Sequence, residues 1–303
     1  MKTFAIGFDT SNYTTSCAVF DGETGENVSR QLDVPESAIG LRQSDALFSH
    51  VKYLPEVFSK LPLDGKIAAV GASVTPREAE GSYMPCFLAG TSHGTVLARG
   101  LGVRFLGFSH QQGHVAAAAW SSGRIDMLDK PMLCWHLSGG TTELLHVKPA
   151  GRSVVCEALG GTSDISCGQL VDRAGKLLGY KFPSGKALDE LAVSADGSDE
   201  YSPKMDGLWF SLSGVEHKVK VMVAADVAAG EIARFAFWAL TSAVRTITGR
   251  AREQYGDLPV LLSGGVASSA YLRRELPDGV YAAPGFSSDN AMGTAILTYR
   301  AVE

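Results

Sequence analysis

The chain has 303 residues, a length that predicts two domains, and its 45% hydrophobic content is enough for two buried cores. Its net charge of −5 excludes a general electrostatic attraction to nucleic acid, so an RNA partner would need a local basic patch or a second protein. No apolar run reaches bilayer length, no signal-peptide pattern precedes the first strand, and the five cysteines form no C-x-x-C pair. We therefore expect a cytoplasmic globular protein with reduced cysteines and no membrane partner.

Two segments, residues 4–21 and 132–147, share one pattern: an apolar strand, a polar turn and a second apolar strand. Small residues and hydroxyls in a tight hairpin leave backbone N–H groups and side-chain oxygens free to approach phosphate oxygens. Such a turn is also an ordinary hairpin, but its recurrence about half a chain apart favours a nucleotide site. The residues that this pattern singles out are Asp9, Thr10 and Ser11 in the first turn, and Ser138, Gly139, Gly140 and Thr141 in the second.

A third turn follows a buried strand near the C-terminus, where residues 258–263 end in Gly264 and Gly265. In doubly wound folds, ligands bind beyond the carboxyl ends of such strands. Helices are predicted at 47–61, 87–102, 113–120, 168–178, 186–193 and 227–253. The two hairpin turns resemble the phosphate loops of the ASKHA superfold (actin-like ATPase, RNase H-like), and this resemblance implies an α/β protein with two similar lobes and a ligand cleft between them. We place one lobe at 1–125, completed by a C-terminal helix over 288–303, and the other at 126–287.

A histidine pair marks the segment from residue 110 to 120. His110 and His114 are four residues apart, so a helix places them on one face, where two imidazoles can bind one divalent metal. Their alternative roles are a helix cap and a core position. Gln111 stands where a zinc protease has its general-base glutamate, which disfavours peptidase activity. The third candidate ligand is Asp289, whose alternative role is a cap for the final helix.

In this order the motifs resemble the TsaD-type family, formerly called O-sialoglycoprotein endopeptidase (Gcp), whose members transfer a threonylcarbamoyl group to N6 of a tRNA adenosine. The resemblance covers nearly the whole chain. Residues 110–114 resemble the family's paired metal histidines, and residues 289–292 resemble the segment with its third metal ligand. Residues 137–141 resemble its substrate loop, and residues 210–214 resemble its Phe-Ser-Phe-Ser-Gly motif. Residues 168–179 resemble the Gly-Glu-Ala-Phe-Asp-Lys helix, which carries a binding aspartate to Asp172. Residues 182–185 resemble Tyr-Pro-Gly-Gly, which carries a binding glycine to Gly185.

The departures from the family pattern are equally specific. The family's Asp-Glu pair near the N-terminus is replaced by Tyr13 and Thr14, which follow Asn12. Gln112 stands where glutamate is usual in the metal motif, Ser269 replaces a binding asparagine after Gly-Gly-Val, and the Gly-Pro-Gly loop is missing at 75–81. These differences indicate a divergent paralogue that keeps its nucleotide and metal sites better than its transfer chemistry.

The leading hypothesis is an acyltransferase that moves a threonylcarbamoyl group from threonylcarbamoyl-AMP to tRNA adenosine. The resemblance implies one divalent metal, iron or zinc first and magnesium as a further candidate, and ATP, ADP or threonylcarbamoyl-AMP as the ligand. His136 is a candidate fourth metal ligand, because strand alternation puts it on the same side as Ser138; a half-buried strand histidine is the alternative. No residue is an evident covalent nucleophile. The predicted nucleotide contacts are Asp9, Thr10, Ser11, Ser138, Gly139, Gly140, Thr141, Asp172, Gly185, Gly264, Gly265 and Ser269.

Two further functions stay open. A noncatalytic nucleotide-binding protein that regulates or scaffolds another protein fits the loss of the acidic pair, although retention of three metal ligands argues against simple decay. A phosphotransferase of the same superfold could use Asp9 as a metal-associated acid, but the paired histidines have no role in that chemistry. The candidate partners are an adenine nucleotide, tRNA, and a homologous protein or a second copy of this chain.

Overall fold

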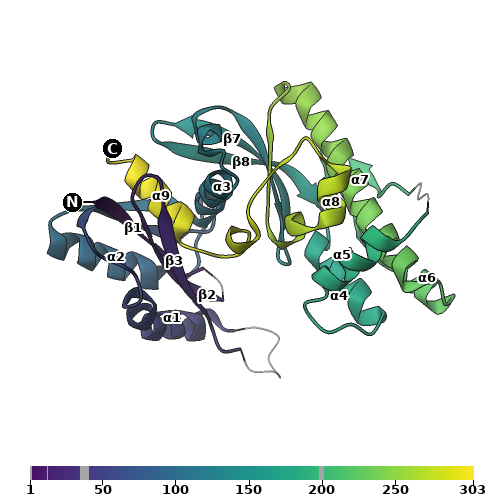
Figure 1. The fold of residues 1–303 in the computed structure, drawn as a ribbon, viewed down its shortest axis with the longest axis horizontal. Coiled ribbons are helices and arrows are strands. Elements are labelled where there is room, and N and C mark those ends of the chain that lie inside the picture. The colour runs from purple at the N-terminus through teal and green to yellow at the C-terminus, as the bar shows by residue number, and fades with distance from the viewer. Residues whose placement is uncertain (1, 12, 35–40, 198–200) are drawn as a thin grey trace. The chain divides into compact units, whose positions relative to one another are not determined.

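The computed structural model describes residues 2–11, 13–34, 41–197 and 201–303, and the chain forms two compact units (Figure 1). Unit 1 comprises Met1–Lys130, Lys148–Cys156 and Asp289–Glu303, and unit 2 comprises Pro131–Val147 and Glu157–Ser288. The first boundary between the units follows Lys130, whereas the predicted boundary follows residue 125. Residues 148–156, which no local pattern separates from the second half, belong to unit 1. None of the helices in the described ranges is both long and apolar enough to cross a bilayer.

Unit 1 is built on a five-stranded sheet in the order β3-β2-β1-β4-β5. The pairs β1–β2 and β2–β3 are antiparallel, whereas β4 runs parallel to both β1 and β5. The strands are β1 (Thr3–Asp9), β2 (Thr14–Phe20), β3 (Gly25–Gln31), β4 (Lys66–Thr75) and β5 (Arg104–Ser109). The predicted strand, turn and strand over 4–21 is therefore the β1–β2 hairpin.

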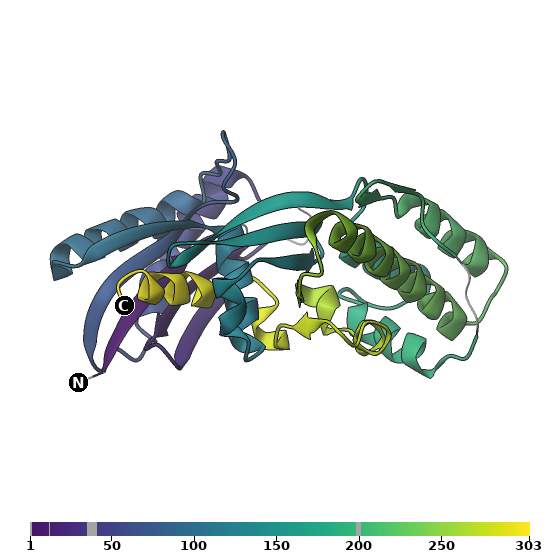
Figure 2. The same cartoon turned by 90° about the horizontal axis from the view of Figure 1, so that it is seen from above.

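Alternation along β1 decides which helices cover each face of this sheet. A Cβ atom on Gly7 would lie 2.5 Å from the backbone nitrogen of Ala295, so α9 (Met292–Arg300) packs directly on that face (Figure 2). The next side chain, Phe8, points to the opposite face and stacks on Phe58 with ring centroids 5.8 Å apart. That face is covered by α1 (Gln43–Phe58) and α2 (Phe87–Leu101).

Unit 2 contains a seven-stranded sheet in the order β12-β11-β6-β7-β8-β10-β9. β6 runs parallel to β11 and antiparallel to β7, so the predicted hairpin over 132–147 and the strand before Gly264 are neighbours. The strands are β6 (Met132–Leu137), β7 (Thr142–Ala150), β8 (Ser153–Thr162), β9 (Met205–Asp206), β10 (Trp209–Phe210), β11 (Val260–Ser263) and β12 (Val280–Tyr281).

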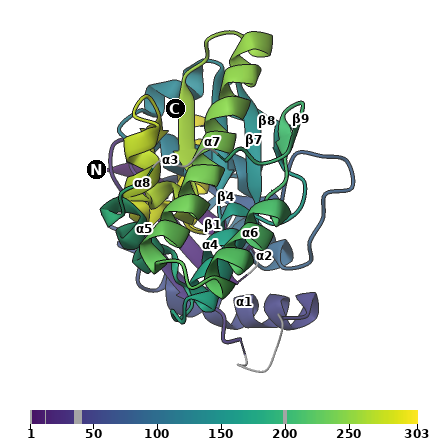
Figure 3. The ribbon, with the colours of Figure 1, turned by 90° about the vertical axis from the view of Figure 1, so that its right-hand side faces the viewer.

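The helix α7 (Ala229–Tyr255) organises the core of unit 2, and Figure 3 shows it running past α4, α5 and α6. Its residues at helical spacing, among them Ile232, Ala236, Leu240 and Ala243, are fully buried, as the apolar pattern over 227–253 predicts. The other helices of this unit are α4 (Cys167–Leu177), α5 (Gly185–Ser194), α6 (Ser213–Ala224) and α8 (Ala270–Glu275). Short 3-10 turns occupy Ile125–Asp129, Gly265–Ser268 and Pro284–Phe286.

Candidate functional site

The helix α3 (His110–Ser121) begins at the first metal-candidate histidine because the preceding residues form a capping box. The hydroxyl oxygen of Ser109 accepts from the backbone N–H of Gln112 at 3.2 Å, and the side-chain oxygen of Gln112 accepts from the backbone N–H of Ser109 at 2.6 Å. Both His110 and His114 then lie on the first turns of the helix, on one face, as the four-residue spacing predicts.

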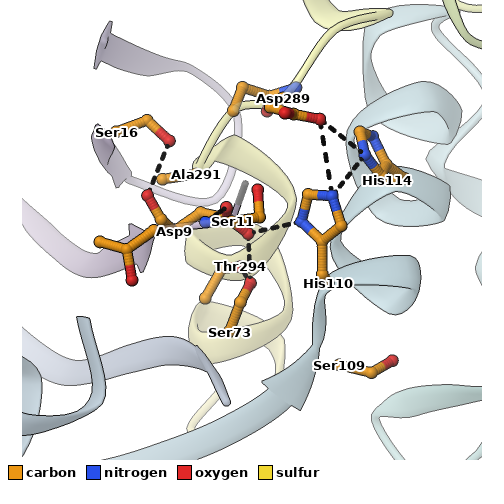
Figure 4. A network of polar contacts seen from close by, with 12 residues as sticks. Asp9, Ser11, Ser16, Ser73, Ser109, His110, His114, Asp289, Ala291 and Thr294 are labelled. Atoms are coloured by element: carbon orange, nitrogen blue, oxygen red, sulfur yellow. Dashed lines mark hydrogen bonds and ion pairs between the residues drawn. The ribbon is translucent and has the colours of Figure 1, made fainter. Parts of the chain in front are cut away.

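Close packing of α3 on α9 brings the third candidate ligand to the histidines. A Cβ atom on Gly293 would lie 1.7 Å from the carbonyl oxygen of Gly113, so the two helices touch backbone to backbone at this point. Asp289 stands just before α9 and therefore reaches the face of α3 that carries the histidines (Figure 4). Only a glycine permits this approach.

The three candidate ligands form one cluster inside unit 1. His110 Nε2 and His114 Nε2 are 2.9 Å apart, and Asp289 Oδ1 lies 3.6 Å from the former and 3.4 Å from the latter. Ligand atoms bound about 2.1 Å from one metal ion are themselves separated by roughly 3.0 to 3.4 Å. Within the described part of the chain this is the group of His, Cys, Asp and Glu side chains whose ligand atoms converge to within 4.8 Å.

The donor set indicates which ions suit the cluster. Two imidazole nitrogens and one carboxylate oxygen are the ligands of catalytic zinc sites and of the two-histidine, one-carboxylate iron sites. Magnesium prefers oxygen ligands throughout and is the least favoured of the three candidates. Three protein ligands leave further coordination positions for water or substrate.

Asp9 stands behind His110 and fixes its orientation. Its Oδ2 atom lies 2.8 Å from His110 Nδ1 and accepts from the hydroxyl of Ser73 at 2.5 Å, while its Oδ1 atom accepts from the backbone N–H of Ser11 at 3.0 Å (Figure 4). The hydroxyl of Thr294 lies 3.1 Å from that of Ser73. A proton held on Nδ1 by this carboxylate leaves the Nε2 lone pair for a metal. The sequence singled out Asp9 as a nucleotide contact, and that role stays a prediction; its buried carboxylate contacts a candidate metal ligand.

Charges in the cluster stabilise one another in the metal-free protein. Burial lowers the pKa of His110, but the nearby carboxylates of Asp9 and Asp289 outweigh burial and raise that pKa to about 10. Burial raises the pKa of the Asp289 carboxyl, but hydrogen bonds from His110 and His114 and the positive charge of His110 hold it well below its usual range. The pKa of Asp9 is lowered in the same way, against burial, by the charge of His110. Two ionised carboxylates therefore favour a cation here.

The first polar turn contributes one unpaired hydroxyl beside the cluster. Ser11 is 2% exposed, and its hydroxyl has no hydrogen-bond partner among the described residues. Leaving such a group unpaired costs about 1–3 kcal/mol, which indicates a polar ligand or water at this position. Thr10 has a different role, because its hydroxyl donates to the carbonyl of Cys86 at 2.9 Å and accepts from the N–H of Gly90 at 3.2 Å, at the start of α2.

Gln112 explains one departure from the family pattern. Its side-chain nitrogen donates to the carbonyl oxygen of Val154 at 2.5 Å and lies 3.5 Å from the hydroxyl of Ser153. These two residues belong to the tip of the β7–β8 hairpin, Lys148–Cys156, which is part of unit 1. A glutamate could keep the capping box but could not donate to a carbonyl, so the amide is what ties the hairpin tip to α3.

The second polar turn lies at the end of β6 in unit 2, against the start of α4. Within the turn the hydroxyl of Ser138 accepts from the N–H of Thr141 at 3.1 Å. Ser166 donates to the carbonyl of Gly139 at 2.7 Å, and a Cβ atom on Gly168 would lie 2.6 Å from the Cα atom of Gly139. Gly139 and Gly140 are exposed, and Cβ atoms added to them would meet nothing within 4 Å. Contacts with Ser166 and Gly168 therefore fix one side of the turn, and its two glycines are exposed on the other side.

The glycine turn after β11 lies next to this loop. Ser263 pairs with His136 in the parallel β11–β6 ladder, so the two strands end side by side. Gly264 has a φ of 90°, and a Cβ atom there would lie 2.2 Å from the carbonyl oxygen of Leu137. It is required by backbone contact, whereas Gly265 is exposed with open space beside it. This is the edge where parallel strands offer a ligand site.

Asp172 and Gly185 come together through the segment between α4 and α5. The Oδ1 atom of Asp172 accepts from the backbone N–H of Ser184 at 2.9 Å and lies 3.2 Å from its hydroxyl. Its Oδ2 atom has no hydrogen bond to the described residues, which leaves it for a ligand hydroxyl. Gly185 is the first residue of α5, with open space where a Cβ would stand.

Two predicted residues are engaged inside unit 2. Ser269 caps α8: its hydroxyl accepts from the N–H of Leu272 at 3.1 Å and donates to Asp189 at 2.5 Å. This hydroxyl therefore has a structural use beside the predicted nucleotide contact. His136 lies on β6 with Nδ1 3.2 Å from the hydroxyl of Ser263, and its role as a fourth metal ligand stays a prediction.

The residues that replace the family's acidic pair lie where β2 begins. Tyr13 is 36% exposed, and its carbonyl accepts from the N–H of Leu32 at 2.8 Å. Thr14 is the first residue of β2, and Asn12 lies outside the described residues. The segment that follows Ser11 therefore carries a phenol and an aliphatic hydroxyl in place of two carboxylates.

Comparison with known proteins gives a consistent assignment. The family model for TsaD, tRNA N6-adenosine threonylcarbamoyltransferase, matches residues 66–296. A tRNA N6-adenosine threonylcarbamoyltransferase of Thermus thermophilus is 27% identical over 306 residues, which cover 98% of this chain and 92% of the relative. The corresponding protein of Symbiobacterium thermophilum is 29% identical over 318 residues, which cover 97% and 90%.

Solved structures support the fold. Component A of (R)-2-hydroxyglutaryl-CoA dehydratase from Acidaminococcus fermentans matches with a TM-score of 0.58 at 14% identity over 99% of both chains. A ROK family glucokinase from Streptomyces griseus matches with a TM-score of 0.53 at 15% identity over 98% of this chain and 99% of the other. These likenesses confirm the predicted α/β ASKHA fold. By its family match, the chain belongs to the TsaD family of tRNA N6-adenosine threonylcarbamoyltransferases.

Proposed function

We propose that this protein transfers a threonylcarbamoyl group from threonylcarbamoyl-AMP to N6 of a tRNA adenosine, with one divalent metal held by His110, His114 and Asp289. The observation that carries the proposal is the convergence of these three ligand atoms within unit 1 of a chain from this family. Iron and zinc are the ions that the donor set favours.

The arrangement around the ligands supports a metal rather than a simple polar core. His110 is oriented by a buried carboxylate on its second nitrogen, which is how proteins hold metal-binding imidazoles. The unpaired hydroxyl of Ser11 is a further sign that a polar group is missing from the neighbourhood of Asp9. A histidine that only caps the helix or packs in the core needs neither the buried carboxylate nor the unpaired hydroxyl.

The nucleotide assignment rests on unit 2. The exposed glycines of the Ser138–Thr141 turn offer backbone N–H groups to phosphate oxygens, and the Oδ2 atom of Asp172 can accept from a ligand hydroxyl. Gly185 and Gly265 leave space for close approach of a ligand.

The proposed reaction is an acyl transfer. The N6 amine of adenosine attacks the carbamoyl carbon, the bond from that carbon to the phosphate oxygen breaks, AMP leaves, and the amine loses one proton to solvent. When bound, the metal would supply a Lewis acid for the developing negative charge. The residues of this chain would bind and align the donor, and alignment alone can supply several kcal/mol of the barrier reduction.

The test compares metal content and activity in three purified proteins. The double variant His110→Ala, His114→Ala should lose the metal measured by elemental mass spectrometry and lose formation of threonylcarbamoyladenosine from threonylcarbamoyl-AMP and unmodified tRNA. His217→Ala, which changes an exposed histidine on α6, is the matched control and should keep both. An unchanged metal content in the double variant would overturn the metal assignment.

The second candidate function is a noncatalytic nucleotide-binding paralogue that acts through a protein partner. The observation in its favour is the replacement of the family's acidic pair by Tyr13 and Thr14. A wild-type protein that binds metal and adenine nucleotide but forms no modified adenosine, even as the variant Tyr13→Asp, Thr14→Glu, would favour this role.

A further inference from the structure

We propose that the α4–α5 loop, residues 178–184, together with its flanking lysines, is a binding surface for single-stranded RNA. The proposal rests on the proposed function in that it names the part of the chain that holds the RNA acceptor. It depends on exposed aromatic rings, on an unpaired basic cluster and on the rigidity of the loop, all within unit 2.

The loop exposes an unusual amount of apolar and aromatic surface. Phe182 is 83% exposed, more than any other large hydrophobic residue that the structure describes, and Tyr180 and Leu177 beside it are 38% and 40% exposed. One exposed apolar residue needs no explanation, but three within six positions form a patch. An aromatic ring held in water can stack on a nucleobase of any identity.

The charges around these rings are positive. Lys176, Lys181 and Lys186 are exposed, and none of them forms an ion pair with the described residues. The sequence from 173 to 187 contains no acidic residue. A chain with a net charge of −5 therefore carries a local basic segment, which is what an RNA partner requires.

Three acidic residues flank this segment, and two of them accept hydrogen bonds from backbone N–H groups. Asp172 accepts from the backbone of Ser184, and Asp189 accepts from the backbone N–H of Ala270 at 2.7 Å as part of the α8 cap. Glu190 remains exposed beside the cluster. All three carboxylates keep their charge, so a phosphate backbone is attracted to the stretch from 173 to 187, which contains the three lysines and no acidic residue.

The loop is fixed at both ends, so the rings are presented in a set place. At its start, the N–H of Tyr180 donates to the carbonyl of Gly175 at 2.9 Å, and Gly179 adopts a left-handed φ of 83° that ends α4. At its end, the buried hydroxyl of Ser184 packs so closely that a Cβ atom on Gly175 would lie 2.1 Å from it. A preformed platform lowers the entropy lost on binding.

The composition favours RNA over a protein partner. Lysine is depleted at the centres of protein–protein interfaces, whereas alternation of lysines with aromatic rings is typical of surfaces that bind single strands. The loop is followed directly by Gly185, one of the residues proposed to bind the donor nucleotide. An RNA strand stacked on Phe182 would therefore lie next to the donor, as an acyl transfer to its adenosine requires.

The experiment measures binding of the full-length protein to a fluorescent, adenosine-containing single strand of about 12 nucleotides and to the matched duplex. Phe182→Ala should weaken binding of the single strand by about tenfold, whereas Phe182→Trp, which keeps an aromatic ring, should bind it as tightly as the wild type does. Phe48→Ala, at a 71% exposed phenylalanine on α1, is the control and should bind as the wild type does. Replacing Lys176, Lys181 and Lys186 by Ala should reduce the dependence of log Kd on log salt concentration by about 2.

The outcomes separate this proposal from the proposed function. Loss of RNA affinity with unchanged metal content and unchanged nucleotide binding would support the RNA surface. Unchanged RNA affinity in both the Phe182→Ala and the triple-lysine variants would overturn it and leave the loop to contact a protein. No binding of either RNA by the wild type would also overturn it, while metal and nucleotide measurements would still decide the proposed function independently.

Discussion

Asp9 and His110 are 101 positions apart in the sequence, yet the carboxylate of the first lies 2.8 Å from Nδ1 of the second and decides which imidazole nitrogen faces Asp289. β1 ends at Asp9, and α3 begins at His110. The pairing therefore connects the first polar turn to the metal candidates. It places that turn in contact with a candidate metal ligand, which its resemblance to a phosphate loop does not indicate.

The first prediction concerns this pair. Asp9→Asn should lower metal affinity by about 10- to 100-fold, because an amide no longer holds the proton of Nδ1 as strongly. Competition with a chromogenic chelator measures the affinity, and Asp126→Asn, at an exposed carboxylate in the 3-10 turn of unit 1, is the control. Equal metal affinity in Asp9→Asn and the wild type, with both folded, would show that the pairing has no part in metal binding.

The second prediction concerns pH. With the pKa of His110 raised to about 10 in the metal-free protein, a metal must displace a proton, so metal affinity should rise by up to about tenfold per pH unit between pH 7 and 9. Titration calorimetry in buffers of different ionisation enthalpy would show release of about one proton per metal. Affinity that does not change with pH would mean that His110 is already neutral before the metal binds.

The same shifts set the pH dependence of stability without metal. The folded pKa of His110 lies above its unfolded value of 6.5, so its stabilisation is full below pH 6.5 and is lost as pH rises toward 10. The folded pKa values of Asp9 and Asp289 lie below the unfolded value of 3.8, so their stabilisation is present above that pH and is lost in acid. The melting temperature of the metal-free protein should therefore be highest between about pH 4 and 6.5.

The third prediction concerns the contact between α3 and α9. Gly293→Ala places a methyl group 1.7 Å from the carbonyl oxygen of Gly113, and relief of this clash should cost about 1–3 kcal/mol in the free energy of unfolding and move Asp289 away from the histidines. Gly100→Ala, on the exposed side of α2 with nothing within 4 Å, is the matched control. It should be neutral or stabilising by about 0.5–1 kcal/mol. Denaturant unfolding and metal content measure the two effects.

The fourth prediction concerns Gln112. The substitution Gln112→Glu keeps an acceptor for the N–H of Ser109 but puts a buried carboxylate against the carbonyl of Val154, which should cost about 1–3 kcal/mol in stability. The rate of backbone amide hydrogen exchange should rise at residues 153–156 of the hairpin tip. Gln169→Glu changes the equivalent position of the capping box of α4, where the side chain is exposed, and should be tolerated. Similar effects of the two changes would refute the proposed tie between α3 and the hairpin.

The local parts of this protein could be predicted from its residues alone. His110 and His114 share a helix face because the helical period places residues four apart on one side, and the Ser-x-x-Gln pattern at 109–112 fixes where that helix begins. The two polar turns follow from apolar runs broken by small and hydroxylated residues. Ordered motifs were also enough to predict the family, which the family match confirms.

The meeting of distant residues depends instead on how the elements pack. Asp9 reaches His110 over 101 positions, and Ser73 reaches Thr294 over 221, because β1, β4, α3 and α9 pack together. Likewise Gln112 binds Val154, 42 positions away, once the β7–β8 hairpin tip joins unit 1. Local periodicity carries no information about such contacts, since they depend on which faces are buried against one another. The glycines at 113 and 293 permit the closest of them, because a side chain at position 293 would hold the two helices apart.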